Sequence, residues 1–424
     1  MPGILSSAAC FCLSSTGGAR LPVNPPGSKN QAHPKARKYG KSAVSAHTHA
    51  FMIRSHKGPI ALRMSTSTRP LVIRFGRVGD TLLLQPLLRR LHARYGEPCT
   101  LLAAGRYAID LYHDQPDVAD VMALRAHHRP LLLSPEQWRV VCVLRRMRDV
   151  PVYVCEPQAR ALERIRLLLR LAGIPDSHCV FLDDVPPGED GHWIEYLLRL
   201  ADMTPPAFRD RFAQVTQTTS AVPTFHVGVA DRAACSQWLV ERGLAGHPLV
   251  LLQPANKRTI RRGGVREASD DDKSWPTENW VRVILAIRAQ MPQARVLLCG
   301  SPAEHRYLET IRTTVARPGV DVIAKELPLP RLKALLAVAH SMISVDTGPA
   351  HIAAAMGCPL VVMFGAVSPK HWRPRAHHAD AVRVLGGPPL STRVDAIAPE
   401  AVIDAWLSLP SREREAALCG RDER

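Results

Sequence analysis

The sequence predicts an α/β protein built from two doubly wound, Rossmann-like domains that face each other across a crevice. Short apolar runs alternate with periodic helical segments between residues 70 and 365, in two series separated by a loop-like stretch. Strands that alternate with helices form parallel sheets with helices on both faces. With 424 residues, of which 46% are hydrophobic, the chain can bury the cores of two such domains.

The first series occupies residues 69–245, including the linker to the second series. It opens with an apolar run at 71–75, a glycine-containing turn and a periodic helix at about 80–95. Further strands are expected at 100–103, 140–144 and 152–155, and helices at 158–172, 192–201 and 233–242. Proline and polar residues at 202–223 indicate a loop, so the domain boundary is placed near Gly246.

The second series occupies residues 246–395 and repeats the alternation. Strands are expected at 249–252, 295–299, 320–324, 342–345 and 360–364, and helices at 280–289, 304–315, 330–339 and 349–356. A last helix within 396–410 is expected to pack back on the first domain, and 411–424 form a tail. The ligand crevice of such a pair of domains lies at the carboxyl ends of the strands.

Residues 1–68 are expected to form a disordered basic extension. They contain nine Lys or Arg residues and no Asp or Glu, and they lack hydrophobic periodicity. This acid-free composition is similar to that of a transit peptide. A nucleic-acid-binding arm is a more specific interpretation of the same composition. Met52 and Met64 lie just ahead of the first clear strand, so translation from Met1 and from either internal methionine are alternatives.

The formal charge of +17 favours anionic partners such as nucleotide phosphates, nucleic acid or the inner leaflet of a membrane. The uncharged apolar stretch 352–367 is interrupted by Gly357-Cys358-Pro359 and is shorter than the ~20 apolar residues of a membrane span. The ten cysteines form no CxxC pair and show no metal-ligand spacing with histidine. These features predict a cytoplasmic protein without a bound metal or cofactor.

The first candidate site is the segment 74–80, Arg-Phe-Gly-Arg-Val-Gly-Asp, which follows the first strand. Gly76 and Gly79 allow the backbone to turn sharply and approach a ligand, and Asp80 stands at the start of the following helix. A carboxylate at the carboxyl end of a strand is well placed as a general base for an acceptor hydroxyl. The alternative is that Asp80 only caps the helix.

The second candidate site is the segment 345–351, Val-Asp-Thr-Gly-Pro-Ala-His. Gly348 permits a tight turn, and the next residue, a proline, suits the first helical position, so the free amides of the helix start can bind a diphosphate. Thr347 can donate to that phosphate, whereas Asp346 accepts hydrogen bonds and therefore suits sugar hydroxyls. Helix capping by Asp346 and Thr347, and a buried structural role for His351, are the alternatives.

Two further segments complete the set. Lys273 lies in the run Asp-Asp-Asp-Lys-Ser-Trp-Pro at 270–276, where its charge can meet a donor phosphate; a solvated loop anchored by Trp275 is the alternative. Glu304 begins a helix after a strand and can hold paired ribose hydroxyls, or it is an exposed helix acid.

Taken together and in this order, these segments resemble the heptosyltransferases of glycosyltransferase family 9 over nearly all of residues 69–410. The resemblance rests on Ile73-Arg74-Phe75 with Gly79-Asp80, on 271–276 with Trp280, and on 345–348 with His351, Gly357, Pro359 and Phe364-Gly365. It implies a GT-B fold, with the acceptor on the first domain and the donor, ADP-heptose, on the second. It also implies inverting, metal-independent transfer to a lipopolysaccharide precursor, a lipid A-type acceptor at the inner face of the cytoplasmic membrane.

The resemblance also assigns roles to residues. Asp80 becomes the general base, Gly76 and Gly79 meet the acceptor, and Lys273 meets the donor phosphate. Asp346 binds the heptose hydroxyls, Thr347, Gly348 and His351 form the phosphate-binding helix start, and Glu304 contacts the nucleoside. The chain departs from the family in having Gly76 in place of a small hydroxyl residue, and Ala366-Val367-Ser368 where Pro-Thr-Asp is common.

Other functions stay open at this stage. The second departure allows a family relative that uses another sugar nucleotide or adds a later core sugar. A non-catalytic nucleotide-sugar or nucleic-acid binder is a different class, against which Asp80 and Lys273 both argue. A dinucleotide-dependent oxidoreductase is disfavoured because no GxGxxG motif with a later acid follows an expected strand.

Overall fold

The computed structural model describes residues 68–411 except 131–132, 187–190, 213–217, 262–263 and 267. The described residues belong to one compact unit, Ser65–Arg424. The expectations for the basic extension 1–68, for Met52 and Met64, and for the tail 411–424 therefore fall outside the described residues, apart from Thr68 and Ser411.

The first half of the described chain is built on a parallel sheet with the strand order β3-β2-β1-β4-β5. Its strands are β1 (Leu71–Arg74), β2 (Cys99–Ala103), β3 (Val118–Ala123), β4 (Val152–Val154) and β5 (Cys179–Phe181). Each neighbouring pair is parallel, with Leu71 opposite Thr100 on one side and Val152 on the other. Because β1 is buried along its whole length, its apolar run continues without alternation.

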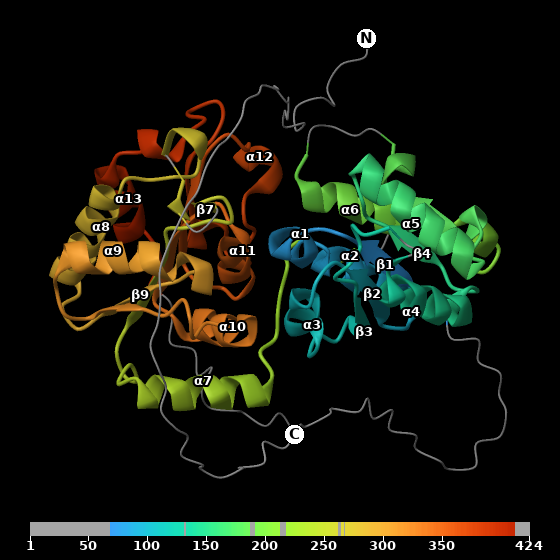
Figure 1. Cartoon of the computed structure of the whole chain (residues 1–424), viewed down its shortest axis with the longest axis horizontal. Helices are drawn as coiled ribbons and strands as arrows, with labels where there is room; N and C mark the ends of the chain where they lie inside the picture. The colour runs from blue at the N-terminus through green and yellow to red at the C-terminus, as the bar shows by residue number, and fades with distance from the viewer. Residues whose placement is uncertain are drawn as a thin grey trace, which may run out of the picture. The chain divides into compact units, whose positions relative to one another are not determined.

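The helices of this half connect the strands on both faces of the sheet (Figure 1). They are α1 (Val78–Leu82), α2 (Gln85–Tyr95), α3 (Tyr107–Tyr112), α4 (Pro135–Leu144), α5 (Ala159–Ala172) and α6 (Trp193–Asp202). Helix α2 ends at Gly96 and α5 at Gly173, and both glycines adopt the left-handed conformation that residues with a Cβ atom avoid.

The second half is built on a six-stranded parallel sheet with the order β10-β9-β6-β11-β12-β13. Its strands are β6 (Leu249–Gln253), β9 (Arg295–Leu298), β10 (Val320–Val322), β11 (Ser341–Val345), β12 (Leu360–Phe364) and β13 (Val382–Gly386). A separate antiparallel pair joins β7 (Ile260–Arg261) to β8 (Gly264–Val265). The six-stranded order is that of dinucleotide-binding folds, in which ligands bind where the strand order reverses.

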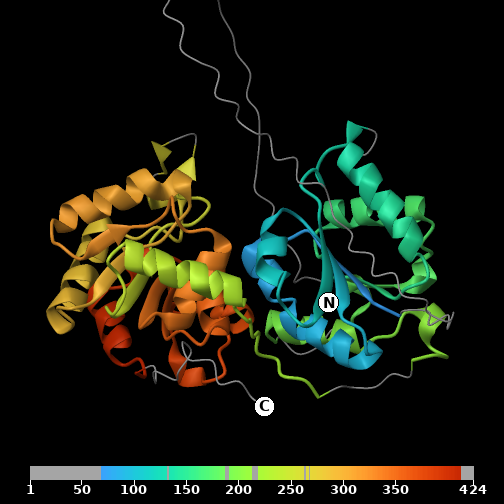
Figure 2. The ribbon, with the colours of Figure 1, turned by 90° about the horizontal axis from the view of Figure 1, so that it is seen from below.

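The helices of the second half are α7 (Val229–Glu241), α8 (Thr277–Gln290), α9 (His305–Val315), α10 (Leu329–Val338), α11 (Gly348–Ala355), α12 (Pro369–Trp372) and α13 (Pro399–Leu407). Short 3-10 turns are η2 (Arg145–Met147), η3 (Asp176–His178), η4 (Leu182–Asp184), η5 (Pro206–Phe208), η6 (Ala268–Asp270), η7 (Pro302–Glu304), η8 (Ala379–Ala381) and η9 (Val394–Ala396). Helix α7 lies against α10, so it packs with the second half although it precedes Gly246 (Figure 2).

Two pairs of helices make extensive contacts between the two halves. Helix α1 packs against α11, and α3 packs against α10. One hydrophobic cluster contains residues of both halves, from Val72 to Val382. The carboxyl ends of β1 and β11 are therefore held close together. None of the helices within the described ranges is long and apolar enough to cross a membrane.

Three expectations about elements are wrong. Residues 140–144 belong to α4, whose start at Pro135 is capped by the Ser134 hydroxyl; the apolar residues there form the buried face of a helix. The helix expected at 80–95 is two helices, separated by a turn at Leu83 and Leu84. The last helix, α13, packs on α8, β12 and β13 of its own half rather than on the first domain, because Val402 and Trp406 belong to the core of the second half.

Candidate functional site

The predicted site residues lie in turns at the carboxyl ends of the central strands. Asp80 follows β1, which is flanked by β2 and β4, and the segment 346–351 follows β11, which is flanked by β6 and β12. Both positions are the points where strand order reverses, and parallel α/β sheets bind ligands at such points. The packing of α1 against α11 brings the two turns together.

The carboxylate of Asp80 is held by two donors. Its Oδ2 accepts a hydrogen bond of 2.8 Å from the backbone N–H of Arg77, and its Oδ1 lies 3.3 Å from a guanidinium nitrogen of Arg74. Asp80 is the third residue of α1, not its N-cap, and its side chain stays 25% exposed. Asp80 thus makes a capping interaction and also stays accessible, as a general base must.

Arg74 connects Asp80 to a second carboxylate, Glu156. The Arg74 side chain is 5% exposed, and its Nη1 lies 3.4 Å from Glu156 and donates to the carbonyl of Cys155. Glu156 also accepts hydrogen bonds from the backbone N–H groups of Phe75 and Gln158. Burial raises the pKa of Glu156, and the Arg74 cation opposes this effect. Arg74 therefore fixes the turn after β4 as well as Asp80.

Two of the three glycines in these turns lie where an added side chain would be crowded. A Cβ atom on Gly76 would lie 2.6 Å from Cβ of Asp80, and one on Gly348 would lie 3.3 Å from the backbone nitrogen of Gly79. A Cβ atom on Gly79 would lie 3.5 Å from the His351 ring, which is ordinary contact. Gly76 and Gly348 thus allow distances that a side chain would increase.

The turn between β11 and α11 presents polar groups toward α1. Thr347 is the N-cap of α11, but its hydroxyl bonds to the Ser344 hydroxyl at 3.1 Å and not to the helix amides. His351 is buried, its Nε2 lies 3.8 Å from Asp346, and its Nδ1 has no hydrogen-bond partner among the described residues. Burial lowers the pKa of His351, and the charges of Asp346, Lys273 and Asp80 act on it as well.

Lys273 and Asp346 form a pair. The Lys273 ammonium lies 2.5 Å from the Asp346 carboxylate and 2.8 Å from the Asp346 carbonyl oxygen. Both side chains are largely buried, at 16% and 10% exposure. The expected donor-binding lysine and the expected sugar-binding aspartate therefore come together, with Lys273 tying its own loop to the start of α11.

The acidic run at 270–272 is structural in part, so the alternative of a solvated loop is wrong for two of its residues. Asp271 is buried and accepts a hydrogen bond from the side chain of Asn256. Asp272 accepts from the backbone N–H of Ala366 at 2.7 Å and pairs with Arg258. Although burial acts in the opposite direction, these two donors lower the pKa of Asp272. Trp275 is buried as expected, and its indole N–H donates to the carbonyl of Ile397.

The sequence left two interpretations of Glu304, and the structure excludes the one in which it is an exposed helix acid. It is 6% exposed, and its carboxylate accepts a hydrogen bond of 2.6 Å from the backbone N–H of Ser301. Burial raises the pKa of Glu304, which this hydrogen bond opposes. Its position after β9 keeps it at the same edge of the sheet as β11, because the two strands flank β6.

A second contact between the halves lies beside Arg74. Trp193 and Trp372 stack with ring centroids 5.3 Å apart, and Arg74 lies 5.9 Å above the Trp193 ring. His192 is buried; its Nε2 donates to the carbonyl of Arg373, and its Nδ1 accepts from the N–H of Ile194. Burial, and next the Arg375 cation, lower the pKa of His192 to about 4.

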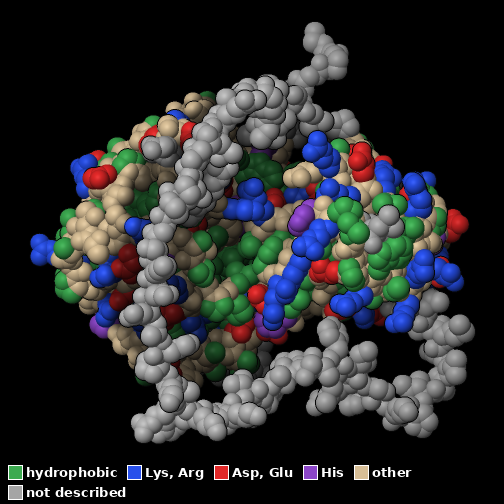
Figure 3. Space-filling view, in the orientation of Figure 1, with side chains coloured by type: hydrophobic (Ala, Val, Ile, Leu, Met, Phe, Trp, Pro, Cys, Tyr) green, Lys and Arg blue, Asp and Glu red, His purple; other side chains and the backbone are tan. Residues whose placement is uncertain are grey.

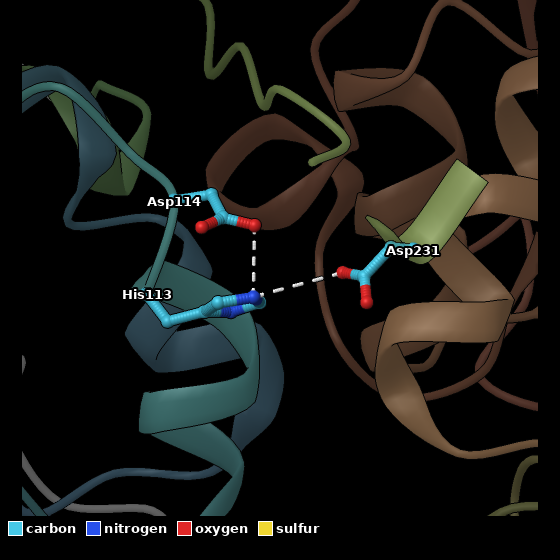
Figure 4. Close-up of side chains that lie close together, drawn as sticks. All are labelled: His113, Asp114 and Asp231. Atoms are coloured by element: carbon cyan, nitrogen blue, oxygen red, sulfur yellow. Dashed lines mark ion pairs between the residues drawn. The ribbon is translucent and has the colours of Figure 1, made fainter. Parts of the chain in front are cut away.

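A cluster of three side chains on α7 and after α3 has the composition of a metal site (Figure 4). His113 Nε2 lies 2.8 Å from Asp114 and 3.7 Å from Asp231. The buried ammonium of Lys333, which lies 3.5 Å from the carbonyl of Leu111, feels both carboxylates. Because the Lys333 ammonium already supplies positive charge to these carboxylates, the cluster is explained as a polar network between the halves.

The site contains residues to which the sequence analysis assigned no role there: Arg74 and Asp272, which it named only as parts of motifs, and Glu156, His192, Asn256 and Arg258. Glu156 was within reach, because it follows strand β4 as Asp80 follows β1. The roles of Arg258 and Asp272 depend on contacts between segments far apart in the chain, for which the sequence carries no signal.

Comparisons with known proteins agree with this geometry. Residues 263–395 match the family model described as glycosyltransferase family 9 (heptosyltransferase). The chain is 24% identical over 331 residues to lipopolysaccharide heptosyltransferase 2 of Escherichia coli K12, covering 75% of this chain and 88% of that protein. It superposes on the structure of E. coli ADP-heptose LPS heptosyltransferase II with a TM-score of 0.60 and 21% identity, over 80% of this chain and 98% of that one. For E. coli heptosyltransferase WaaC with ADP, the TM-score is 0.57 and the identity 18%, over 79% and 98%.

The two parallel sheets, whose turns meet at both switch points, have the GT-B fold that is found in glycosyltransferases. More particularly, residues 263–395 match the model of glycosyltransferase family 9, the heptosyltransferase family, and the chain is similar to lipopolysaccharide heptosyltransferases.

Proposed function

We propose that this protein transfers a heptose from ADP-heptose to a lipopolysaccharide core or lipid A precursor, with inversion at the anomeric carbon and without a metal ion. The observation that carries the proposal is the environment of His351. The buried His351 ring lies 3.8 Å from Asp346, which pairs with Lys273, and a Cβ atom on Gly79, the residue before Asp80, would lie 3.5 Å from the ring. A candidate base and candidate donor-binding groups thus converge on one place.

Asp80 acts as the general base. Its carboxylate removes the proton from an acceptor hydroxyl while the hydroxyl oxygen attacks the anomeric carbon. The new glycosidic bond forms as the bond to the diphosphate breaks, and ADP leaves with both bonding electrons. A single displacement of this kind inverts the anomeric configuration. Two donors hold the carboxylate, and it keeps further lone pairs for the proton.

The second half stabilises the departing diphosphate. The free amides at the start of α11 and the Lys273 ammonium supply positive electrostatic potential there, which offsets the charge that develops on the leaving group. The unpaired Nδ1 of His351 is a further polar atom for the donor. These groups provide the stabilisation for which other transferases use a cation. Heptosyltransferase WaaC, which shares the fold, binds ADP, and this supports an adenine nucleotide here.

The acceptor is proposed to be lipid-linked, and the protein to act at the cytoplasmic face of the inner membrane. The relatives named above act in lipopolysaccharide synthesis, which supports such an acceptor. We propose that Gly76 and Gly79 line its path to Asp80, because these glycines leave the backbone of the first loop open beside the carboxylate.

The loop at 366–368 favours one second candidate, a transferase that uses another sugar nucleotide. Asp272 holds the backbone of Ala366, so this loop is fixed although it lacks the acid and hydroxyl common in the family. Because this loop lacks that acid, the charged residues that we propose for heptose binding are Asp346 and Lys273.

The test is ADP release by the full chain with ADP-heptose and Kdo-lipid A in the presence of a chelator. Release that requires acceptor and is lost in Asp80→Asn supports the proposal, and the anomeric configuration of the product reports inversion. Release that disappears with chelator refutes metal independence. Binding of ADP-heptose without release with any acceptor favours a non-catalytic binder, and turnover with UDP- or GDP-sugars alone favours the second candidate.

A further inference from the structure

Helix α4 carries a solvent-exposed apolar surface beside a shallow hollow of about 720 Å³. We call it the α4 surface and define it by Leu133, Trp138, Arg139, Cys142, Val143 and Arg146. Leu133 is 73% exposed and Val143 is 40% exposed, and both belong to the large hydrophobic residues that the fold leaves in contact with water. Trp138 is half-buried against the core of the first half.

Two arginines, Arg139 and Arg146, supply the positive charge of this surface. Neither Arg139 nor Arg146 forms an ion pair with any residue in the described part of the chain, and both are exposed. The neighbouring helix α5, which packs on α4, adds exposed side chains that are equally unpaired there: Arg160, Arg164 and Arg170. Figure 3 shows Lys and Arg side chains gathered around hydrophobic ones over this part of the molecule.

The acids nearby do not neutralise this charge. Helix α4 has one acid, Glu136, and its carboxylate already accepts hydrogen bonds from the backbone N–H groups of Arg125 and Ala126. Helix α5 has one acid, Glu163, and four arginines, at positions 160, 164, 166 and 170. A surface with unpaired arginines around exposed aliphatic and tryptophan side chains matches the interface of an anionic bilayer, where headgroups meet the cations and acyl chains meet the apolar groups.

The α4 surface adjoins the acceptor side of the proposed site. Glu136 and Gln137, at the start of α4, bind the backbone of the segment 125–129. Within that segment the His127 ring lies 5.2 Å from the ring of Phe75. Phe75 directly precedes Gly76 in the turn that carries Asp80. A bilayer on the α4 surface would therefore place a lipid-borne acceptor at the entrance to this turn.

We infer that the α4 surface docks the enzyme on a membrane rich in anionic phospholipid. This inference rests on the proposed function in one respect: docking would give the enzyme access to a lipid-linked acceptor. The apolar side chains Leu133 and Val143 enter the headgroup region, and the arginines bind lipid phosphates around them. An acidic protein partner would need the same cations, and it is distinguished by the test below.

The test compares binding of the full chain to vesicles of phosphatidylglycerol and phosphatidylethanolamine with binding to phosphatidylcholine vesicles. The double variant R139E/R146E should bind anionic vesicles about tenfold more weakly or worse, since each arginine near an anionic surface contributes to binding. Its matched control is R306E/R317E, which makes the same charge change at two exposed, unpaired arginines on and after α9. The control should bind almost as tightly as the unsubstituted chain.

A second variant, L133S/V143S, leaves all charges in place and should also weaken vesicle binding. Equal weakening by R139E/R146E and the control, or no weakening by either, would overturn the proposal and assign binding to overall charge or to the basic residues 1–68. Loss in R139E/R146E with none in L133S/V143S would overturn insertion of the apolar side chains and leave adsorption by the arginines alone. Absence of binding to anionic vesicles by the unsubstituted chain would overturn the proposal in favour of an acidic protein partner. Thermal unfolding of each variant checks that the fold is intact.

Activity separates this inference from the proposed function. With a water-soluble acceptor that lacks acyl chains, R139E/R146E should keep the turnover of the unsubstituted chain; with acceptor embedded in anionic vesicles it should lose most of it. An unsubstituted chain that transfers no heptose in either assay contradicts the proposed function, and vesicle binding then still decides on the α4 surface. Equal activity of the variant on embedded acceptor contradicts the docking role.

Discussion

The ammonium of Lys273 lies 2.5 Å from the carboxylate of Asp346, and the two side chains come from loops 73 residues apart. The pair is nearly buried and Lys273 also binds the Asp346 carbonyl, so each residue fixes the position of the other. Their proposed roles in donor binding are therefore coupled.

We predict that Lys273→Ala and Asp346→Asn each raise the dissociation constant of ADP-heptose by about tenfold or more, and that the double variant is less impaired than the sum of the two. Residues in direct contact typically show coupling of about 0.5–3 kcal/mol. Isothermal titration with ADP-heptose and with ADP measures the cycle. If Lys273 meets the phosphates, Lys273→Ala weakens ADP as well, while Asp346→Asn affects mainly the sugar nucleotide. Strictly additive effects would show that the pair does not act as a unit.

Arg74 is predicted to position Asp80. Arg74→Met should lower turnover by about a hundredfold, because a small displacement of a catalytic group has an effect of this order. It should also destabilise the protein by about 3 kcal/mol, since it leaves the buried Glu156 carboxylate without its cation.

The double variant Arg74→Met/Glu156→Gln separates the two effects. Removing both charges should restore most of the free energy of unfolding but not the turnover, because Asp80 still lacks its partner. Denaturant unfolding and kcat are measured on the same samples, with Arg74→Lys as the conservative variant that recovers part of kcat. Full recovery of kcat in the double variant would reduce Arg74 to a structural role.

Gly348 is predicted to tolerate no side chain, in contrast to Gly79. Gly348→Ala places a methyl group 3.3 Å from the nitrogen of Gly79 and 3.3 Å from Cβ of Val78, so α1 and α11 must move apart. Gly79→Ala meets only the His351 ring at 3.5 Å. We expect Gly348→Ala to lower kcat/KM by about tenfold or more. Of the two variants, Gly79→Ala should have the smaller effect on the melting temperature. The reverse order would contradict the observed approach of the two helices.

His192 is predicted to make the protein sensitive to acid. Its pKa is about 4 in the folded protein and near 6.5 in the unfolded chain, so the unfolded chain takes up the proton first as the pH falls. The stability associated with neutral His192 is complete above pH 6.5 and is lost as the pH falls toward 4, with an upper bound of roughly 3 kcal/mol. Protonation of Nδ1 would also remove the acceptor for the Ile194 N–H.

The variant His192→Asn should therefore lose less stability than the unsubstituted chain between pH 6.5 and pH 4. Urea unfolding at a series of pH values measures the difference. Parallel pH dependence of the two proteins across this range would show that His192 does not remain neutral in the folded state.

Much of this architecture follows from local pattern. The strands after residues 70, 99, 151, 248, 294, 341 and 359 are confirmed, because buried parallel strands are continuous apolar runs between turn residues. The positions of Asp80 and of the segment 346–351 at the ends of central strands also follow from chain order, since a carboxylate or glycine directly after a strand must lie at that edge of the sheet. The segment 140–144 was misassigned because a short apolar run is the same in a strand and on one face of a helix.

Only the tertiary structure decided which residues contact one another in the site. The pairing of Lys273 with Asp346, of Asp272 with Ala366 and of Arg74 with both Asp80 and Glu156 joins segments that are distant in the chain. Sequence spacing carries no record of such contacts, because they depend on the packing of α1 on α11 and on loops that fold back over the sheet. The sequence by itself determined two doubly wound halves with reactive turns at their strand ends; only the packing of those halves decided that the turns face one another across the glycines at positions 79 and 348.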